Sequence, residues 1–338
     1  MSEVIGKNGI SARVVSKSIC PDGIILTTWE YEAPKCILAE INTHGMLSKN
    51  AQSSRAVPVK KVIEQIRNNP VVPVHWGSNK AGMVAGEEID NVVKFSNCGR
   101  LSMIGERLDE NDYLPKEAAW VETAEVAAEL MEAWSKAGYH KQIVNRIGEA
   151  FTFVKGVITA TEIDNFFHLR YHPHADPYMS ELARCMWEAY VTAEAEELSL
   201  GEWHTPYVEH VRNEAGDLAY VLDGRVLSLE EALKASSAGC AQVSYRALDL
   251  SEEKINKVWS NLMEGDIIHA SVTSHQGTPL PCANKLSSMH DLKFFKTIGI
   301  THFVFEDGSY WSGNFRGWSQ YRKHIKNESF KGKFIGIM

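Results

Sequence analysis

The sequence predicts a mixed fold of the α+β class, with a central, mostly antiparallel sheet flanked by helices. Stretches rich in β-branched and aromatic residues, such as 23–32 and 151–160, indicate buried strands. Long stretches with helical periodicity, of which 116–137 is the clearest, indicate amphipathic helices. The two kinds of stretch do not alternate as regular βα units, so a doubly wound parallel sheet is not expected.

The first half of the chain predicts seven segments. They are a strand over 23–32, a helix over 34–44, a polar loop over 48–58, a helix over 59–67, an irregular excursion over 72–115, a helix over 116–137 and a second helix around 140–150. Pro34 suits a first helical turn, and Ile37 and Ile41 recur four residues apart. Gly138 is a typical C-terminal cap.

The second half predicts a further series, with a change of composition over 200–228. The elements are a strand over 151–160, a short helix over 162–170, a helix from 177 to about 198, a helix from 228 to about 235, a strand over 240–248, a helix over 251–264, a hairpin over 303–312 and a last helix over 316–325. Asp176 before Pro177 is a strong helix start, and Ser228 with Glu231 forms a capping box. The hairpin turns at 307–308, Asp-Gly.

Composition excludes several classes of function. The 338 residues carry a net charge of −8, which disfavours a non-specific nucleic-acid binder because such proteins need a basic surface. No apolar run approaches a membrane span of about 20 residues, and the first residues lack the apolar stretch of a signal peptide. The six cysteines show no CxxC spacing. We therefore expect reduced thiols and a cytoplasmic protein without membrane or nucleic-acid partners.

The segment 43–55, THGMLSKNAQSSR, is the first candidate for a site. A helix end delivers His44, and a loop then presents Ser48, Asn50, Ser53, Ser54 and Arg55. Such side chains and their backbone N–H groups can donate to phosphate oxygens. From composition alone the segment is either a candidate anion site or a solvated polar loop.

A second candidate is 165–175, NFFHLRYHPHA. Arg170 has apolar neighbours, so we expect it to be partly buried and to need an anionic or carbonyl partner. His168, His172 and His174 raise the alternative of a metal site. Pro173 interrupts the helix between the last two, and no HExxH glutamate accompanies them, so no metal is expected.

These segments resemble the motifs of the flavin-dependent thymidylate synthases. The family pattern R-H-R-x-x-S-x-N-x-x-S-x-R matches at His44, Ser48, Asn50, Ser53 and Arg55. Residues 165–175 resemble its N-F-x-x-L-R block followed by H-A-Q. Weaker likenesses are 241–245 to A-R-V-S-F, 269–275 to H-x-S/T-P-F-E-H, and 312–323 to the terminal signature of a longer, phage-like branch. Together they span most of residues 24–325.

The resemblance implies an activity and a set of partners. The family methylates dUMP to dTMP reductively, with FAD as cofactor, methylenetetrahydrofolate as carbon donor and NADPH as reductant. It is a homotetramer whose sites are shared between subunits, so a pyrimidine deoxynucleotide and folate are the implied partners. Residues 1–200 would hold the nucleotide and flavin motifs, and 201–338 would complete the same fold, as one continuous domain or as two parts. If the chain is phage-encoded, its compartment is the host cytoplasm.

The resemblance also implies roles for individual residues. Arg170 and Ser53 are the implied catalytic residues, with Arg170 favouring ionisation of the pyrimidine at N3. The implied nucleotide-binding residues are Glu40, Ser53, Ser54, Arg55, Arg146 and Arg170. The implied flavin-binding residues are Thr43, His44, Gly45, Thr159, Thr161, Asn165, His174 and Ser271. Ser271 would reach the flavin from a neighbouring subunit.

The sequence departs from the family pattern at several positions. Thr43 and Gly45 replace two arginines, and Gln242 replaces a third. Residues 272–274 replace P-F-E, and Asp176 and Tyr178 replace a glutamine and a glutamate. Three interpretations stay open: a working thymidylate synthase, an enzyme that methylates or hydroxymethylates another pyrimidine deoxynucleotide such as dCMP, and a non-catalytic nucleotide-binding subunit. The retained Ser53, Arg55, Arg146 and Arg170 favour an enzyme.

Overall fold

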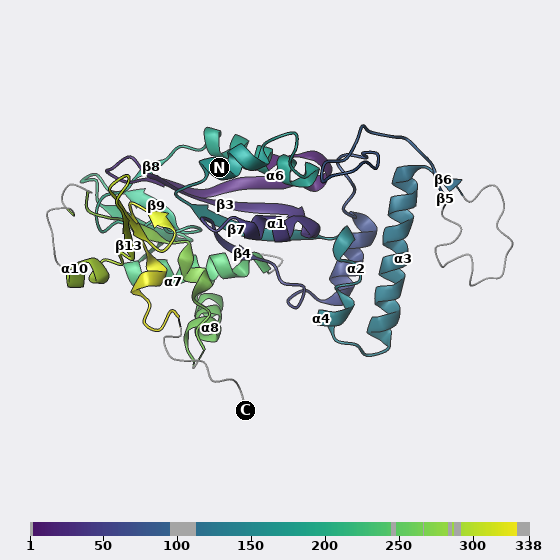
Figure 1. Cartoon of the computed structure of the whole chain (residues 1–338). Coiled ribbons are helices and arrows are strands. Elements are labelled where there is room, and N and C mark those ends of the chain that lie inside the picture. Colours follow the sequence, from purple (N-terminus) through teal and green to yellow (C-terminus); the bar gives the residue numbers. More distant parts are fainter. Residues whose placement is uncertain are drawn as a thin grey trace, which may run out of the picture.

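The computed structural model describes residues 3–94, 113–244, 248–265, 267–282, 286 and 292–329. A six-stranded sheet lies at its centre (Figure 1). Its strands are β1 (Val4–Ile5), β2 (Ser11–Ile19), β3 (Ile25–Pro34), β4 (Ser48–Ala51), β7 (Phe153–Ala160) and β8 (Glu196–Glu197). The order β1-β2-β3-β7-β4 is antiparallel throughout, and β8 joins β2 in parallel. The mixed helices and antiparallel sheets agree with the predicted α+β class.

One face of the central sheet is apolar and is covered by helices. These helices are α1 (Leu38–Thr43), with the short 3-10 turn η2 (Lys35–Ile37) before it, α5 (Asp164–Arg170) and α6 (Pro177–Thr192). The fully buried Trp29 of β3 lies in one cluster with Met186 of α6 and Phe167 of α5. Burying a side chain of this kind contributes about 1.5–3 kcal/mol. The apolar layer therefore fixes α1 and α5 against the sheet.

The opposite face of the sheet is polar. Thr28 of β3 and Thr159 of β7 hydrogen-bond to each other there at 2.8 Å. A bulge in β2 shifts its pairing with β3 between Val14 and Ser16. Val14 thus stays in the apolar core, whereas Ser16 and Ser18 turn to the polar face, because one extra residue reverses the alternation.

A pair of helices stands at one end of the central sheet, away from the C-terminal third (Figure 1). The pair is α2 (Val59–Asn68) and α3 (Lys116–Lys136), followed by α4 (Lys141–Val144) and the 3-10 turn η4 (Glu149–Phe151) that leads into β7. Ile66, Met131 and Val144 are fully buried in a core of their own between these helices. Between α2 and α3 the described residues hold only the short pair β5 (Val93–Lys94) and β6 (Tyr113–Leu114).

The C-terminal third packs on the polar face of the central sheet. It contains the sheet β9 (Glu209–Arg212), β10 (Leu218–Leu222) and β11 (Arg225–Leu227), the helices α7 (Leu229–Ala241), α8 (Glu252–Met263) and α10 (Leu292–Thr297), the 3-10 turns η5 (Gln242–Ser244), η6 (Ala270–Ser274) and η7 (Tyr321–His324), and the strands β12 (Gly277–Pro279), β13 (His302–Val304), β14 (Ser309–Ser312), β15 (Phe315–Arg316) and β16 (Trp318–Gln320). Contacts between β4 and η6 join it to the sheet. The predicted division near residue 200 stays a prediction.

Most predicted elements are confirmed to within a few residues. The matching elements are β3, η2 with α1, α2, α3, β7, α5, α8 and the β13–β14 hairpin. Asp176 caps α6 by accepting from the backbone N–H groups of Tyr178 and Met179. The capping box of Ser228 and Glu231 also forms. These signals act within one helical turn, which is why the sequence alone reveals them.

Several predicted boundaries are wrong. The helix from 177 ends at Thr192, because the chain turns there to pair β8 with β2. The helix from 228 continues to Ala241 instead of stopping near 235. The second helix around 140–150 is only α4, one turn long, and η4.

Three predicted elements are of the wrong kind. The polar loop over 48–58 begins with β4, whose Ser48 pairs with Thr159 of β7. The strand over 240–248 is instead the end of α7 and η5 in its described part, because Cys240 packs on Val157; residues 245–247 lie outside the description. The helix over 316–325 is instead β16, paired with β12, and η7. In each case a partner distant in sequence decides the structure.

Two further findings concern the helices and the cysteines. None of the helices in the part of the chain that the structure describes is both long and apolar enough to cross a bilayer. The five cysteines within the described residues are free thiols, and Cys98 lies outside them.

Candidate functional site

Two segments far apart in the sequence meet at one pocket of about 330 Å³. The residues after the end of α1 form one side, and α5 with the residues before it forms the other. The pocket is lined by Thr43, His44, Gly45, Met46, Leu47, Glu162, Asp164, Asn165, Phe166, Leu169 and Arg170. We call it the His44 pocket. It brings together four of the eight predicted flavin residues, Thr43, His44, Gly45 and Asn165, with Arg170, the predicted catalytic arginine.

Arg170 joins the two sides of the His44 pocket. Its Nη1 donates to Glu40 Oε2 at 3.1 Å, and its Nε donates to His44 Nε2 at 2.8 Å. The side chain is 23% exposed, so it is partly buried as the sequence predicts, and Glu40 is the anionic partner. A guanidinium has five N–H donors, so donors remain for a ligand in the pocket.

His44 is held in its neutral form. Burial lowers the pKa of its imidazole below the usual value, and the nearby charges of Arg170 and Lys49 lower it further. Because Nε2 accepts from Arg170, we assign the ring proton to Nδ1. Phe166 packs edge-on against the ring, with 5.0 Å between centroids. His44 therefore adds a neutral N–H donor to the pocket lining.

Lys49 holds the turn that carries His44. Its Nζ donates to the carbonyl oxygens of Ile41 and Asn42, each at 3.3 Å, and of His44 at 2.6 Å. These carbonyls lie at the C-terminal end of α1, where the helix dipole favours a cation. The sequence analysis missed this role, because Lys49 belongs to no matched motif position.

Replacing Lys49 by methionine tests its hold on His44. We expect a loss of about 1 kcal/mol in the free energy of unfolding, since a helix C-terminus loses its cation. We also expect the pKa of His44 to rise, because Lys49 is one of the charges that lower it. Two-dimensional NMR titration of the His44 ring measures this.

Lys17→Met is the matched control for that substitution. Lys17 Nζ donates to the carbonyls of Tyr190 and Ala193 at the end of α6, at 2.8 and 2.9 Å. It should cost similar stability and leave the titration of His44 unchanged. An equal shift of the His44 pKa in both variants would contradict a specific role for Lys49.

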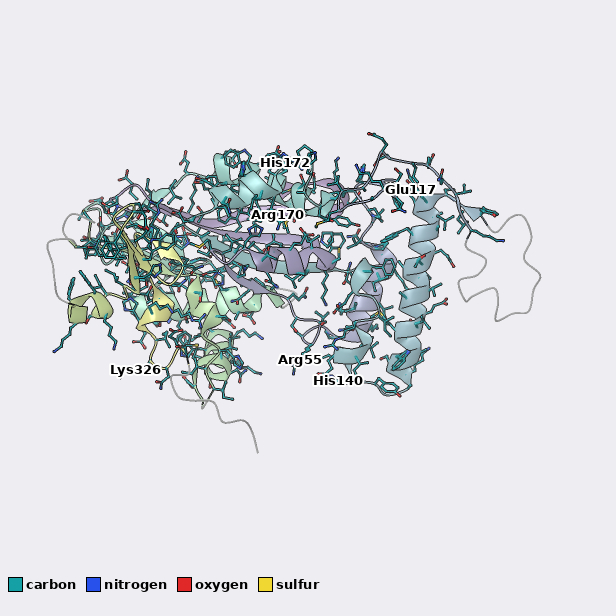
Figure 2. The ribbon with its side chains drawn as sticks, in the orientation of Figure 1. Arg55, Glu117, His140, Arg170, His172 and Lys326 are labelled. Atoms are coloured by element: carbon teal, nitrogen blue, oxygen red, sulfur yellow. The ribbon has the colours of Figure 1, made fainter. Side chains whose placement is uncertain are left out.

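The predicted nucleotide residues Ser53 and Ser54 line a different pocket, of about 280 Å³. We call it the Ser53 pocket. Its lining is Glu32, Lys35, Gln52, Ser53, Ser54, Val57, Lys61, Val62, Gln65, Asn145, Thr152, Phe153, Val154 and Lys155. It shares no residue with the His44 pocket. In Figure 2 Arg55 lies well apart from Arg170. Within one chain the two halves of the predicted site stay apart.

The loop at the Ser53 pocket has a fixed shape. The buried Asn145 donates through Nδ2 to the carbonyls of Ser54 and Val57, at 2.8 and 2.9 Å. Arg55 and Arg146 are exposed and make no ion pair with any described residue, so both guanidinium groups are available to an anion. Three lysines and one glutamate line the pocket, and each lysine pairs with a glutamate: Lys35 with Glu149, Lys61 with Glu64 and Lys155 with Glu32.

Two predicted flavin residues face away from both pockets. Thr159 is fully buried, and its Oγ1 hydrogen-bonds to Thr28 and to His275 Nδ1, each at 2.8 Å. Thr161 accepts from the backbone N–H of Arg316 at 3.0 Å. Nothing in this geometry supports a contact between either threonine and a flavin.

Two further predicted flavin residues, His174 and Ser271, lie outside the His44 pocket. His174 is exposed and does not line the His44 pocket. Ser271 lines a third pocket, which adjoins the His44 pocket at Leu47. The described residues contain no group of three histidine, cysteine, aspartate or glutamate side chains placed to hold a metal ion.

Of the residues that line the third pocket, only Ser48 and Ser271 were noted as candidate site residues from the sequence. We call it the Gln320 pocket, and its volume is about 420 Å³. Its lining is Leu47, Ser48, Lys49, Ser271, Ser274, Gly313, Asn314, Gln320, Arg322 and Lys323. The only sequence signal for the last five was the likeness of 312–323 to a terminal signature.

Two departures from the family pattern have different structural settings. Gly45 lines the His44 pocket, and a Cβ atom there would meet no atom within 4 Å, so a larger side chain would fit in open space. Gln242 is 2% exposed and exchanges hydrogen bonds with the backbone of Asp249, so its side chain is held away from the pockets. Of these two positions, Gly45 lies at a pocket and Gln242 does not.

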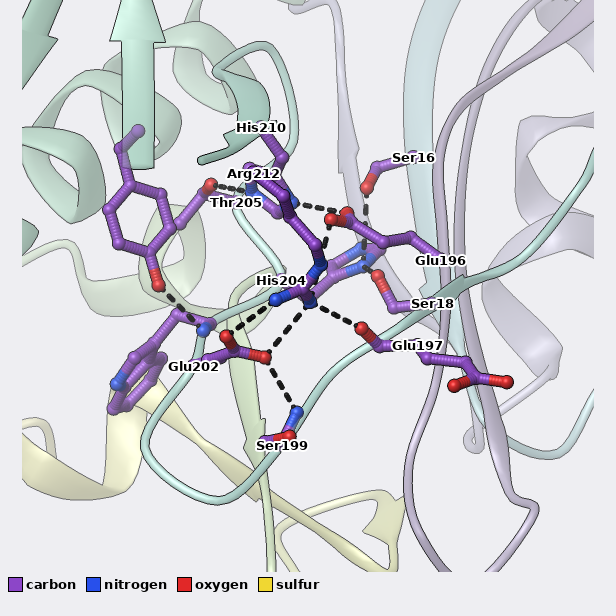
Figure 3. A network of polar contacts seen from close by, with 12 residues as sticks. Ser16, Ser18, Glu196, Glu197, Ser199, Glu202, His204, Thr205, His210 and Arg212 are labelled. Atoms are coloured by element: carbon purple, nitrogen blue, oxygen red, sulfur yellow. Dashed lines mark hydrogen bonds and ion pairs between the residues drawn. The ribbon is translucent and has the colours of Figure 1, made fainter. Parts of the chain in front are cut away.

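A cluster of histidines and glutamates lies beside the polar face of the sheet (Figure 3). His210 joins the hydroxyl of Thr205, at 2.7 Å from Nε2, to the carboxylate of Glu196, at 2.5 Å from Nδ1. This order resembles a hydroxyl nucleophile with its base and orienting acid. Thr205 is fully buried, however, so no substrate can reach its hydroxyl, and the cluster is structural.

Comparison with known proteins gives a weak structural likeness. No family model and no curated protein sequence matches the chain. Its structural neighbours include thymidylate synthase X from Helicobacter pylori with FAD and dUMP, at 15% identity and a TM-score of 0.30. Another is the flavin-dependent thymidylate synthase of the same organism complexed with FAD and dUMP, at 16% identity and a TM-score of 0.29. Each alignment covers 49% of this chain and 67% of that chain. At these scores the neighbours do not by themselves assign a function.

Proposed function

We propose that the chain is a flavin-dependent enzyme that methylates a pyrimidine deoxynucleotide, converting dUMP to dTMP. The observation that carries this proposal is the His44 pocket. The sequence motifs predicted that segments 43–45 and 165–170 serve one site, although more than a hundred residues separate them. Both segments line the same cavity.

The residues of the His44 pocket fit a flavin ring. The volume, about 330 Å³, lies in the range of small-molecule sites. Asn165, Arg170 and the Nδ1–H of His44 offer donors to ring oxygens and nitrogens, and Gly45 leaves space beside them. Bound FAD would supply the hydride, with NADPH as its reductant and methylenetetrahydrofolate as the carbon donor. On this proposal the fold is that of the flavin-dependent thymidylate synthases.

In this proposal Arg170 acts on the pyrimidine. Glu40 and His44 hold its guanidinium in one orientation before a ligand binds. A fixed cation near N3 stabilises the negative charge that forms when the pyrimidine ionises. Neutral His44 suits this role, because a second positive charge beside Arg170 would weaken its orientation.

The Ser53 pocket would bind the phosphate of the nucleotide. Ser53 and Ser54 supply donors in its lining, on a loop that Asn145 fixes, and the exposed Arg55 and Arg146 come directly after Ser54 and Asn145 in the chain. Since this pocket and the His44 pocket lie apart in one chain, a complete site needs the Ser53 pocket of another subunit. We therefore propose a homotetramer with shared sites, and light scattering that shows only monomers would contradict it.

A second substrate class is favoured by one observation. Gly45 leaves open space in the His44 pocket where the family has an arginine, and Thr43 replaces another. The loss of two bidentate donors changes what the pocket can recognise. A dCMP methylase or hydroxymethylase is the alternative enzyme, and a nucleotide-binding subunit without catalysis is the alternative binding protein.

Flavin content is the first test. Purified protein should be yellow, with about one flavin per chain after addition of FAD. Protein that stays colourless and binds no added FAD would rule out both enzymes, while retained binding of dUMP would support the non-catalytic subunit.

The substrate assay separates the two enzymes. The protein is incubated with dUMP or dCMP, methylenetetrahydrofolate and NADPH, and the products are weighed by mass spectrometry. We expect the mass gain of one methyl group on dUMP. A gain on dCMP alone, or the larger gain of a hydroxymethyl group, would identify the alternative substrate or product.

A further inference from the structure

The Gln320 pocket is strongly basic. Its lining includes Lys49, Arg322 and Lys323 and no acidic side chain. The pocket is also larger in volume than the His44 pocket, at about 420 against 330 Å³. A concave surface with one sign of charge favours an anionic ligand.

Buried polar groups form the floor of the Gln320 pocket. Ser48, Ser274 and Gln320 are 6%, 7% and 2% exposed. Gln320 Nε2 donates to Ser48 Oγ at 3.2 Å, to the carbonyl of Ser274 at 3.1 Å and to Asn314 Oδ1 at 2.8 Å. One amide thus fixes three separate chain segments around the cavity. The floor is therefore rigid before any ligand arrives.

Gly313 keeps the pocket open. Its φ of 62° lies in the left-handed region that favours glycine. A Cβ atom there would come within 2.6 Å of Gln320 Oε1 and 3.2 Å of Lys323 Cε. Any larger residue would therefore press on the floor and on one of the cations.

A single carboxylate holds two of the three cations. Glu328 Oε2 accepts from Arg322 Nε at 2.8 Å, and Glu328 Oε1 accepts from Lys323 Nζ at 2.9 Å. Glu328 reaches back because Asn327 turns the chain with a φ of 58°, a conformation that asparagine tolerates better than most residues. The carboxylate does not line the pocket, yet it contacts the groups that an anionic ligand would need.

We propose that the Gln320 pocket binds a phosphate or diphosphate group, and that Glu328 occupies its cations until such a ligand displaces the carboxylate. Two oxygens of one carboxylate on Arg322 and Lys323 make the contacts that two phosphate oxygens would make. Lys49 also lines the pocket and adds its positive charge, while its N–H donors stay on the carbonyls at the end of α1. The inference does not depend on the proposed function, because it concerns an anion and not a reaction.

Calorimetry with sodium diphosphate at low ionic strength tests the site on the full chain without flavin or nucleotide. Glu328→Gln should raise the affinity for diphosphate about tenfold. The substitution removes the negative charge that holds Arg322 and Lys323, and hydrogen bonds to charged groups are the stronger ones. Lys323→Gln, added to Glu328→Gln, should remove that gain. Lys326→Gln is the matched control, since Lys326 is an exposed lysine of the same segment outside the pocket.

The outcomes are distinct. Unchanged diphosphate affinity in the folded Glu328→Gln variant, checked by circular dichroism, would overturn the proposal, and so would equal losses from Lys323→Gln and Lys326→Gln. Titration with FAD and with riboflavin then identifies the source of the phosphate. If Glu328→Gln binds FAD more tightly than the wild type does and its affinity for riboflavin is unchanged, the ligand is the diphosphate of a dinucleotide. If only its affinity for free diphosphate rises, the ligand is a free phosphate compound. Either result supports the site, whereas failure of the proposed reaction leaves it untouched.

Discussion

Arg170→Ala should reduce turnover by about 100- to 1,000-fold or more, the range seen when one donor to developing negative charge is removed. Arg170 lines the His44 pocket and donates to the carboxylate of Glu40. Its removal also frees Glu40 and His44, whose orientation it sets. Single-turnover kinetics with the favoured nucleotide measures the loss.

A conservative variant separates charge from geometry. Arg170→Lys keeps a cation near Glu40 but loses the planar fork, so we expect activity between those of the wild type and Arg170→Ala. Arg225→Ala is the control, because Arg225 is exposed and pairs with Glu231 and Glu252 away from the pockets. Full activity of Arg170→Ala would show that the guanidinium does not act on the substrate. Loss of activity in Arg225→Ala would point to a general effect on folding.

His204→Ala should lower the free energy of unfolding by about 3–5 kcal/mol, the range for large side chains removed from a core. His204 is fully buried beside Ser16 and Ser18 on the polar face (Figure 3). Its Nδ1 is 2.8 Å from Ser18 Oγ, and its Nε2 is 2.9 Å from Thr28 Oγ1. The substitution leaves a cavity and removes a partner from each hydroxyl, which adds to the cost.

Denaturant unfolding measures this effect. His168→Ala is the control, because His168 is exposed on α5 and its loss should change stability by less than about 0.5 kcal/mol. Similar stability of the two variants would show that the polar face does not anchor the C-terminal third.

The same histidines predict how stability depends on pH. Burial first, and then the charges of His210 and His275, hold the pKa of His204 well below 6.5, and burial lowers the pKa of His275 to about 3. In the unfolded chain both titrate near 6.5. Between about pH 6.5 and pH 3 the unfolded state therefore binds more protons, so stability falls as the pH falls. His204→Ala should weaken this dependence, and an unchanged slope would contradict a neutral buried His204.

The sequence revealed elements whose causes are local. The cap at Asp176, the capping box at Ser228 and the turn at 307–308 each act through contacts within a few residues. The errors all involve distant partners. Residues 48–51 are polar enough to read as a loop, but they complete the sheet because β7 offers a free edge.

The sequence predicted only part of the candidate site, because the rest depends on contacts between residues that are distant in the sequence. Spacing in the sequence identified Thr43–Gly45 and Asn165–Arg170 as a pair of segments, and the tertiary structure placed both on one pocket. Lys49 matched no motif position, and the likeness of 312–323 to a terminal signature did not reveal that Asn314 and Gln320 contact residues 46 and 274. Thr159 shows the converse, since its place at the end of a strand did not reveal that His275 covers it.

The sequence by itself determined the fold class, most of the helices and strands, and the segments that carry the candidate chemistry. Periodicity, caps and turn residues encode these features within short stretches of chain. The tertiary structure alone decided that Arg170 meets Glu40 and His44, that the Ser53 pocket lies apart from them, and that Glu328 holds the cations of the Gln320 pocket. Such contacts depend on how buried surfaces pack, and packing brings together residues that no local pattern relates.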